Sequence, residues 1–197
     1  MSYRVEEKIP LSRSDGVQLL ELLVKAGFKE LYPERVIRST YFDTNNFRIF
    51  SDSEEGLLPR KKIRIRCYPE EISGHNLEIK ISSIEGRFKK TRKLLDDEVL
   101  SINSAGYFDN LYGPVRPVCI VKYSRKYFIK DRVRLTFDQN ITYESYNSCI
   151  LKIPENKCVI EIKASIKEDR DRINSIINYP RARFSKFSEA IKSLELC

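Results

Sequence analysis

Residues 60–68 have the sequence Arg-Lys-Lys-Ile-Arg-Ile-Arg-Cys-Tyr, and this stretch is the strongest indicator of the fold. From Arg60 to Arg66 a cation occupies every second position, and the apolar residues Ile63, Ile65 and Cys67 stand between the cations. Successive side chains of a β-strand point to opposite faces of the sheet. The pattern therefore predicts a strand with one cationic face and one apolar face.

The same alternation of charged and apolar residues returns along the whole chain. It recurs in residues 3–8, 77–81, 90–92, 123–125, 134–138 and 159–163. The economical interpretation is that these charged faces converge on a common interior and that the apolar faces turn outward under helices. An interior with so many cations would need a bound anion, because like charges held close together repel one another.

Composition limits the possible partners without choosing among them. The chain has 197 residues, 41% of them apolar, which is enough for one domain spanning residues 1–197. Its net charge of +8 is compatible with nucleic acid, an acidic membrane surface or a polyanionic small molecule as partner. We expect a cytoplasmic location, since the sequence contains neither an apolar signal core nor a run of about 18 apolar residues. The five cysteines have no paired spacing, which favours reduced thiols over a zinc site or disulfide framework.

The expected secondary structure is mainly antiparallel β-sheet. Residues up to 9 form the first strand, and a helix should follow with Val17, Leu20, Leu23 and Val24 as its apolar stripe. Residues 96–117 should be partly helical. Further strands are expected at residues 36–43, 61–68, 76–82, 87–94, 118–128, 132–139 and 157–165, and helices at 169–178 and 185–196. Many strands joined by short turns predict a closed or nearly closed barrel with covering helices.

Three glutamates lie in the same alternating frames as lysines. Glu6, Glu78 and Glu161 each stand two positions before a lysine, at residues 8, 80 and 163. Each carboxylate could pair with a neighbouring cation, or it could hold a divalent metal that bridges phosphate oxygens. Arginine forks and lysine ammonium groups along a channel suit a linear polyanion such as triphosphate or polyphosphate.

Nine segments occur in an order that resembles the vacuolar transporter chaperone (VTC) domain. These segments are residues 3–8, 39–43, 60–68, 77–80, 90–92, 123–125, 134–138, 159–163 and 184–187. That domain is the polyphosphate polymerase branch of the triphosphate tunnel metalloenzymes, also called CYTH-like. The resemblance implies an α+β, mainly β fold, with a closed eight-stranded antiparallel tunnel. It also implies a divalent metal, Mn²⁺ or Mg²⁺, that helps to transfer the terminal phosphoryl group of ATP to polyphosphate.

The resemblance also assigns roles to individual residues. The cations expected to act on the reacting phosphates are Lys8, Arg64, Arg66, Lys80, Arg125, Arg134 and Lys163. Further substrate contacts are expected from Arg4, Lys62, Lys90, Arg92, Lys186 and Tyr123. The family's metal-binding glutamate corresponds to Glu161, and Glu6 and Glu78 are the additional metal candidates.

One departure from the superfamily pattern separates the possible activities. Hydrolytic and cyclase members typically open with Glu-x-Glu-x-Lys, whereas this chain has Arg4-x-Glu6-x-Lys8. A site with one acid fewer holds a polyanion more tightly, which favours the polymerase branch. The alternatives are a binding module that senses polyphosphate or triphosphate without turnover, and a triphosphatase acting on inorganic or nucleoside triphosphate. A single-stranded nucleic-acid binder is disfavoured because aromatic residues do not accompany the basic strands. A membrane-protein partner for export of the product stays open.

Overall fold

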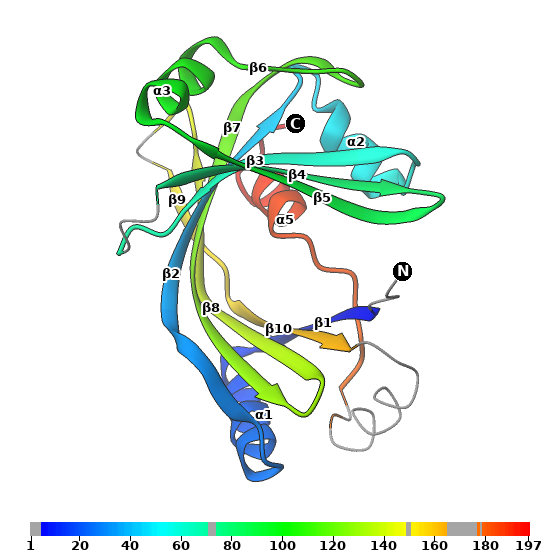
Figure 1. Ribbon diagram of the computed structural model, residues 1–197, viewed down its shortest axis with the longest axis vertical. Coiled ribbons are helices and arrows are strands. Elements are labelled where there is room, and N and C mark those ends of the chain that lie inside the picture. The colour runs from blue at the N-terminus through cyan, green and yellow to red at the C-terminus, as the bar shows by residue number, and fades with distance from the viewer. Residues whose placement is uncertain (1–4, 71–73, 149–150, 165–176, 178) are drawn as a thin grey trace. The chain divides into compact units, whose positions relative to one another are not determined.

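The computed structural model describes residues 5–70, 74–148, 151–164, 177 and 179–197. Its elements are shown in Figure 1. The helices are α1 (Arg13–Lys25), α2 (Arg48–Glu55), α3 (Asp96–Ala105) and α5 (Lys186–Ser193). The strands are β1 (Val5–Ser12), β2 (Lys29–Asp43), β3 (Arg60–Cys67), β4 (His75–Ser83), β5 (Gly86–Leu94), β6 (Tyr107–Asp109), β7 (Gly113–Lys130), β8 (Val133–Ser145), β9 (Lys152–Pro154) and β10 (Lys157–Ala164).

The strands form one sheet that runs through two compact units. Its main path is β1-β10-β8-β7-β2-β3-β4-β5, with β6 pairing β7 and β9 pairing β8. Unit 1 comprises Met1–Val36, Tyr123–Ile141 and Pro154–Phe184, and unit 2 comprises Ile37–Lys122, Thr142–Ile153 and Ser185–Cys197. The long strands β2, β7 and β8 each contribute residues to both units.

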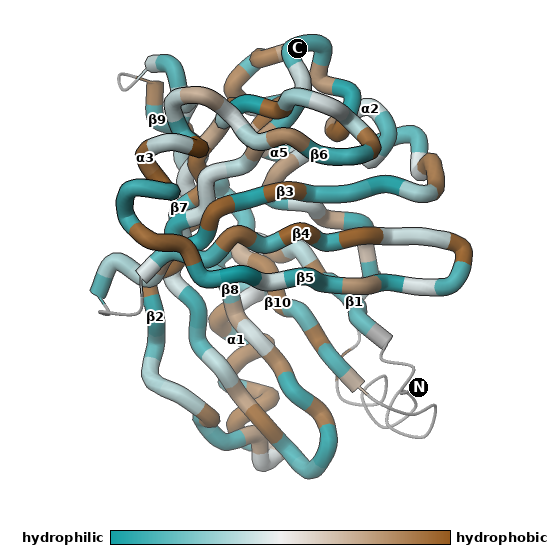
Figure 2. The backbone as a smooth tube through the Cα atoms, turned by 45° about the horizontal axis from the view of Figure 1, so that its top comes forward, coloured by the Kyte–Doolittle hydropathy of each residue, from teal (hydrophilic) through white to brown (hydrophobic). Residues whose placement is uncertain are grey.

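Unit 1 shows the predicted division of the sheet into a charged and an apolar face. In the antiparallel register, Lys8 pairs with Glu161, which in turn pairs with Thr136. The neighbouring positions Ile9, Ile160 and Phe137 face the opposite side and are buried. Helix α1 covers this apolar face, because its Leu19 and Leu23 join the same core cluster. Figure 2 shows the corresponding change between teal and brown along β8 and β10.

Helix α1 approaches the sheet closely at Gly16. A Cβ atom at this position would lie 2.1 Å from Sγ of Cys158 on β10, so only glycine fits there without movement. Ser12 caps the helix by accepting a hydrogen bond from the backbone N–H of Asp15 at 3.1 Å. The predicted stripe was partly wrong, because Val17 and Val24 are 49% and 51% exposed. The buried residues Gly16 and Leu19 show that the helix packs on the sheet through a different side from the predicted one.

Unit 2 repeats the two-faced pattern in β3 and β4. Ile63 and Ile65 pair with Ile79 and Leu77 on the apolar face. The intervening residues form the charged face, where Arg64 pairs with Glu78. At the end of β2, the carboxylate of Asp43 accepts hydrogen bonds from backbone N–H groups at the start of α2, from Ile49 at 2.8 Å and Phe50 at 2.9 Å. Burial raises the pKa of Asp43 to about 6, although these backbone hydrogen bonds act against the increase.

The predicted α+β, mainly β fold is confirmed, and the principal path of the sheet contains eight strands. Strands β2, β7 and β8 are longer than predicted, and residues 141–144 belong to β8. The described hydrogen-bonded path ends at β1 and β5, so closure of the barrel stays a prediction. The helix expected at residues 169–178 lies outside the described residues, except for position 177. Among the described helices, none has the length and apolar character needed to cross a bilayer.

The burial difference between two adjacent residues of α1 gives a test of this packing. Leu23 is completely buried, whereas Val24 is 51% exposed. We expect Leu23→Ala to lower the free energy of unfolding by about 2–5 kcal/mol, as is usual for a core residue cut to alanine. Val24→Ala should change it by less than about 0.5 kcal/mol. Urea denaturation of both variants measures the difference, and equal losses would contradict the orientation of α1.

Candidate functional site

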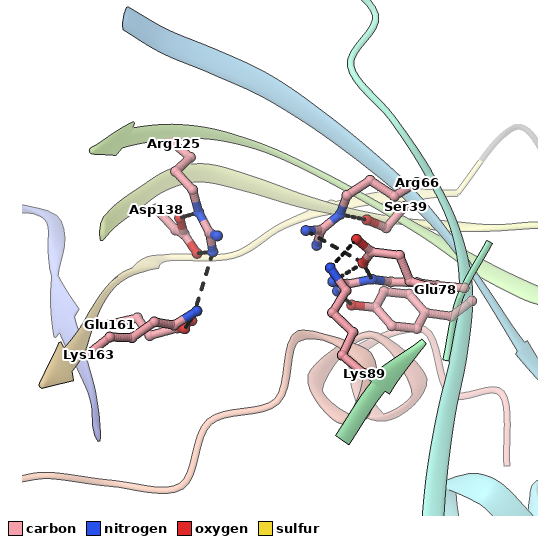
Figure 3. Close-up of polar contacts among 10 residues, drawn as sticks. Ser39, Arg66, Glu78, Lys89, Arg125, Asp138, Glu161 and Lys163 are labelled. Carbon is pink, nitrogen blue, oxygen red and sulfur yellow. Dashed lines mark hydrogen bonds and ion pairs between the residues drawn. The ribbon is translucent and has the colours of Figure 1, made fainter. Parts of the chain in front are cut away.

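A cluster of polar residues surrounds Glu78 on the charged face of unit 2. We call Ser39, Tyr41, Arg64, Arg66, Glu78 and Lys89 the Glu78 cluster. Figure 3 labels Ser39, Arg66, Glu78 and Lys89 of this cluster. Arg64 donates to Oε2 of Glu78 through Nε at 2.7 Å and through Nη2 at 2.5 Å. Arg64 Nη1 also donates to the Tyr41 hydroxyl at 2.9 Å. The guanidinium is thereby held from two sides.

Both oxygens of the Glu78 carboxylate have cationic partners. Lys89 donates to Oε1, and Arg66 Nη1 lies 3.8 Å from Oε2. Burial by itself would raise the pKa of this carboxyl. The charges of Arg64 and Arg66 and the Lys89 hydrogen bond outweigh burial and lower the pKa from 4.5 to about 2. Glu78 is therefore ionised at neutral pH and balances part of the surrounding positive charge.

Lysines also stand directly opposite one another on this face. Lys62 on β3 pairs with Lys80 on β4, and Lys80 pairs with Lys89 on β5. Like charges in directly opposed positions destabilise a sheet. Lys62 also donates to the hydroxyl of Ser185, the residue that caps α5, at 2.7 Å. A row of three lysines across adjacent strands is the arrangement that a bound polyanion would stabilise.

A second cluster lies on the charged face of unit 1. We call Glu6, Lys8, Arg125, Thr136, Asp138, Glu161 and Lys163 the Glu161 cluster, part of which is shown in Figure 3. Arg125 makes a two-pronged contact with the buried Asp138, through Nε at 2.5 Å and Nη2 at 2.7 Å. Lys163 Nζ lies 2.9 Å from Oε1 of Glu161, and Arg125 Nη2 lies 3.9 Å from Oε2.

The electrostatics of Glu161 resemble those of Glu78, but its contacts are looser. Burial alone would raise the pKa of Glu161. The charges of Arg125, Lys163 and Lys8 outweigh burial, so the pKa lies well below its usual range. Arg125 approaches this carboxylate only to an ion-pair distance, beyond hydrogen-bonding range. Thr136, directly opposite Glu161 in the sheet, has a buried hydroxyl that has no hydrogen-bond partner among the described residues. A bound ligand could satisfy that hydroxyl.

The donors of the Glu161 cluster fit a divalent ion that is shared with substrate. In the described part of the chain, no three metal-ligating side chains gather into a group able to hold a metal. Mg²⁺ at phosphate sites commonly needs only one or two carboxylates, because phosphate oxygens and water complete its shell. Glu161 and Glu6 meet this requirement, since Glu6 lies within hydrogen-bonding reach of Glu161. Glu78 fits less well because two cations bond its oxygens directly.

Most of the site residues predicted from sequence lie on the charged faces. In unit 1 these are Glu6, Lys8, Arg125, Arg134, Glu161 and Lys163, and in unit 2 they are Lys62, Arg64, Arg66, Glu78 and Lys80. Lys186 is the first residue of α5, next to Ser185. Tyr123 is buried, and the Arg125 guanidinium carbon lies over its ring, 5.3 Å from the ring centroid. Arg4 lies outside the described residues.

The predicted positions of Lys90 and Arg92 on the charged face are wrong. In the register, Lys90 pairs with Ile79 and Arg92 pairs with Leu77, so both lie on the apolar side. Arg92 instead forms an ion pair with Glu98 of α3 at 2.5 Å. Lys89, which contacts Glu78, was not among the predicted site residues. The hairpin turn was a usable signal, because the two residues between Ser83 and Gly86 fix the register of β5.

Comparison with known proteins gives the family. The VTC domain pattern matches residues 4–195, which is nearly the whole chain. The chain belongs to the VTC domain family. The resemblance inferred from the nine segments is therefore confirmed. Among curated protein sequences, none matches this chain with significance.

Solved structures share the fold of this VTC domain at low sequence identity. A Bacillus halodurans protein provisionally assigned as an adenylate cyclase is 15% identical, with a TM-score of 0.65 over 93% of this chain and 94% of that chain. A Hippeastrum protein provisionally assigned as an adenylyl cyclase, with a dominant triphosphatase activity, is 13% identical, with a TM-score of 0.62 over 97% and 96%. A Pyrococcus horikoshii protein is 16% identical, with a TM-score of 0.62 over 97% and 99%.

The lowered pKa of Glu78 predicts a pH dependence of stability. The folded pKa of about 2 lies below the ordinary value of 4.5, so ionised Glu78 stabilises the folded state above pH 4.5. This contribution is lost as the pH falls through the folded pKa. We expect Glu78→Gln to be less stable than the wild type at neutral pH, and the difference to shrink toward pH 2. Urea denaturation at a series of pH values measures this. A difference in the free energy of unfolding that stays constant with pH would contradict this prediction. Glu55→Gln, at an exposed position, is the control.

Proposed function

We propose that this VTC domain is a metal-dependent polyphosphate polymerase that transfers the terminal phosphoryl group of ATP to inorganic polyphosphate. The observation that carries the proposal is the opposition of like charges, with Lys62, Lys80 and Lys89 in one row of unit 2. Arg134 and Lys163 stand opposite each other in the same way in unit 1. A linear polyphosphate has regularly spaced negative oxygens that suit such rows.

The two clusters would have different roles. The Glu78 cluster has no carboxylate oxygen without a cationic contact, so we assign it to binding phosphates along the chain. The Glu161 cluster has two neighbouring acids and the unsatisfied Thr136 hydroxyl, so we assign it to the metal-bound phosphates. A divalent Mn²⁺ or Mg²⁺ ion there would neutralise charge on the transferring phosphoryl group.

The chain's own residues would act by positioning and by charge. Phosphoryl transfer passes through a loose transition state with negative charge spread over the phosphoryl oxygens, so fixed cations stabilise it without a covalent protein intermediate. Arg125 is well placed for this task, because Asp138 already orients its guanidinium. Lys8 is oriented by a hydrogen bond of 2.8 Å to the carbonyl oxygen of Phe184.

A second candidate is a triphosphatase, which the activity described for the Hippeastrum protein favours. Both reactions cleave a phosphoanhydride bond. The acceptor of the phosphoryl group is a phosphate oxygen in the polymerase reaction and water in the triphosphatase reaction. The same residues could therefore serve both reactions. A binding module without turnover is the third outcome that an assay must separate.

Incubation of the purified protein with ATP and Mn²⁺, followed by phosphorus NMR or gel electrophoresis, tests the proposal. Long polyphosphate is the expected product, whereas orthophosphate alone indicates the triphosphatase and no turnover indicates the binding module. Glu161→Gln should lower turnover by roughly 100-fold through loss of metal charge. Glu30→Gln, at an exposed position of β2, is the control and should retain wild-type turnover. Unchanged turnover in Glu161→Gln would move the metal site elsewhere.

Adjacent lysines of β5 provide a matched test of the charged face. Lys89 contacts Glu78 on the charged face, whereas Lys90 lies on the opposite face. We expect Lys89→Ala to weaken tripolyphosphate binding by about 1 kcal/mol, which is a factor of roughly five in affinity. The expected loss is modest because the Lys89 side chain is half exposed. Lys90→Ala should leave the affinity close to that of the wild type. Isothermal titration calorimetry measures both, and the reverse order would assign binding to the other face.

A further inference from the structure

Four large apolar side chains are exposed at one end of the β3–β4–β5 sheet in unit 2. Ile84, in the turn between β4 and β5, is 90% exposed, and Phe88 is 48% exposed. Leu57 and Leu58, which precede β3, are 50% and 46% exposed. The pairing of Arg60 with Ser82 places the start of β3 beside the end of the hairpin. Figure 2 shows brown segments at both places.

Cations follow the hairpin turn along β5, with Arg87, Lys89 and Lys90 nearest the turn. Between Ile84 and Leu94 the chain has five cations, Arg87, Lys89, Lys90, Arg92 and Lys93, and the single acid Glu85. Every residue from Arg87 to Lys93 is exposed. β5 is an end strand of the described sheet, and its cations alternate between the two faces. Only some of them can therefore act in the charged face that contains Glu78.

We propose that this end of the sheet, formed by residues 57–60 and 84–90, docks on an anionic lipid surface. A bilayer interface accepts protruding apolar side chains among its headgroups, and anionic headgroups attract the neighbouring lysines and arginines. Ile84 lies at the hairpin turn, Leu57 and Leu58 precede β3, and all three are exposed. Phe88 lies within β5, close to the turn, and is half exposed. A nucleic acid would match the cations but not the four apolar side chains. The proposal is independent of the phosphoryl-transfer activity.

Vesicle flotation of the whole protein provides the first test. The protein should float with vesicles that contain phosphatidylserine, and binding should weaken as salt rises from about 0.1 M to about 0.5 M. Vesicles of phosphatidylcholine alone should bind it much less. The double variant Leu57→Ser/Ile84→Ser should lower the partition coefficient by about tenfold, because two apolar side chains no longer enter the interface. Both sites are exposed, and a melting curve of each variant verifies that it folds.

A matched control uses exposed apolar residues elsewhere in unit 2. Leu95, which precedes α3, and Leu100 of α3 are 69% and 71% exposed. Both follow the other end of the nine-residue strand β5, about 30 Å from the hairpin turn. Leu95→Ser/Leu100→Ser should bind vesicles as the wild type does. Equal losses in the two double variants, equal binding to neutral vesicles, or no binding to any vesicle would each overturn the proposal.

The absence of tryptophan from the chain allows a direct optical test. Ile84→Trp introduces a single fluorophore at the hairpin turn, and its emission should shift to shorter wavelength on vesicles that contain phosphatidylserine. Leu100→Trp should show no shift under the same conditions. A shift in both variants, or in neither, would contradict docking through the hairpin. Soluble inorganic phosphate should leave the emission of Ile84→Trp unchanged, which separates the lipid surface from a free anion.

Discussion

The charged faces of the sheet depend on ion pairs between buried carboxylates and arginines. Glu78 with Arg64, and Asp138 with Arg125, are bonded at 2.5–2.7 Å. Without Glu78, Arg64 would lie among the lysines of the same face. A buried charge that loses its partner costs several kcal/mol, so removal of one member destabilises more than the pair stabilises. These carboxylates make a cationic surface compatible with a folded sheet.

The two-faced strands could be predicted from the sequence, because an alternation with a period of two depends only on neighbouring residues. Alternation around Ile63 and Ile65 predicted which side is buried, and the structure agrees. The face of an individual lysine depended instead on strand register, which a single turn sets. Lys90 and Arg92 alternate with Thr91 in the same way as the residues of the charged faces, but the hairpin turn places Lys89 beside Glu78 instead. The period of two alone could not show which of the lysines faces Glu78.

Helix orientation and strand length were less accessible from sequence. The valines of α1 have the spacing of an apolar stripe, but the close approach of Gly16 to Cys158 decides which side meets the sheet. Such a contact between segments far apart in the chain leaves no periodic signal. The partner of Asp138 was also hidden, because Arg125 belongs to a different strand. The resemblance to the VTC domain supplied the list of site residues, and the strand pairings sorted them by face.

The fixed arginines determine how an anion would be bound. Arg64 is held by Glu78 and Tyr41, and the Tyr41 ring stacks on Phe187 at a centroid distance of 5.2 Å. A long side chain ordered only on binding costs roughly 0.5–1.5 kcal/mol of conformational entropy at that moment. Here that ordering takes place when the protein folds. A ligand therefore meets a guanidinium with its rotamer already chosen, so association requires little rearrangement of this side chain.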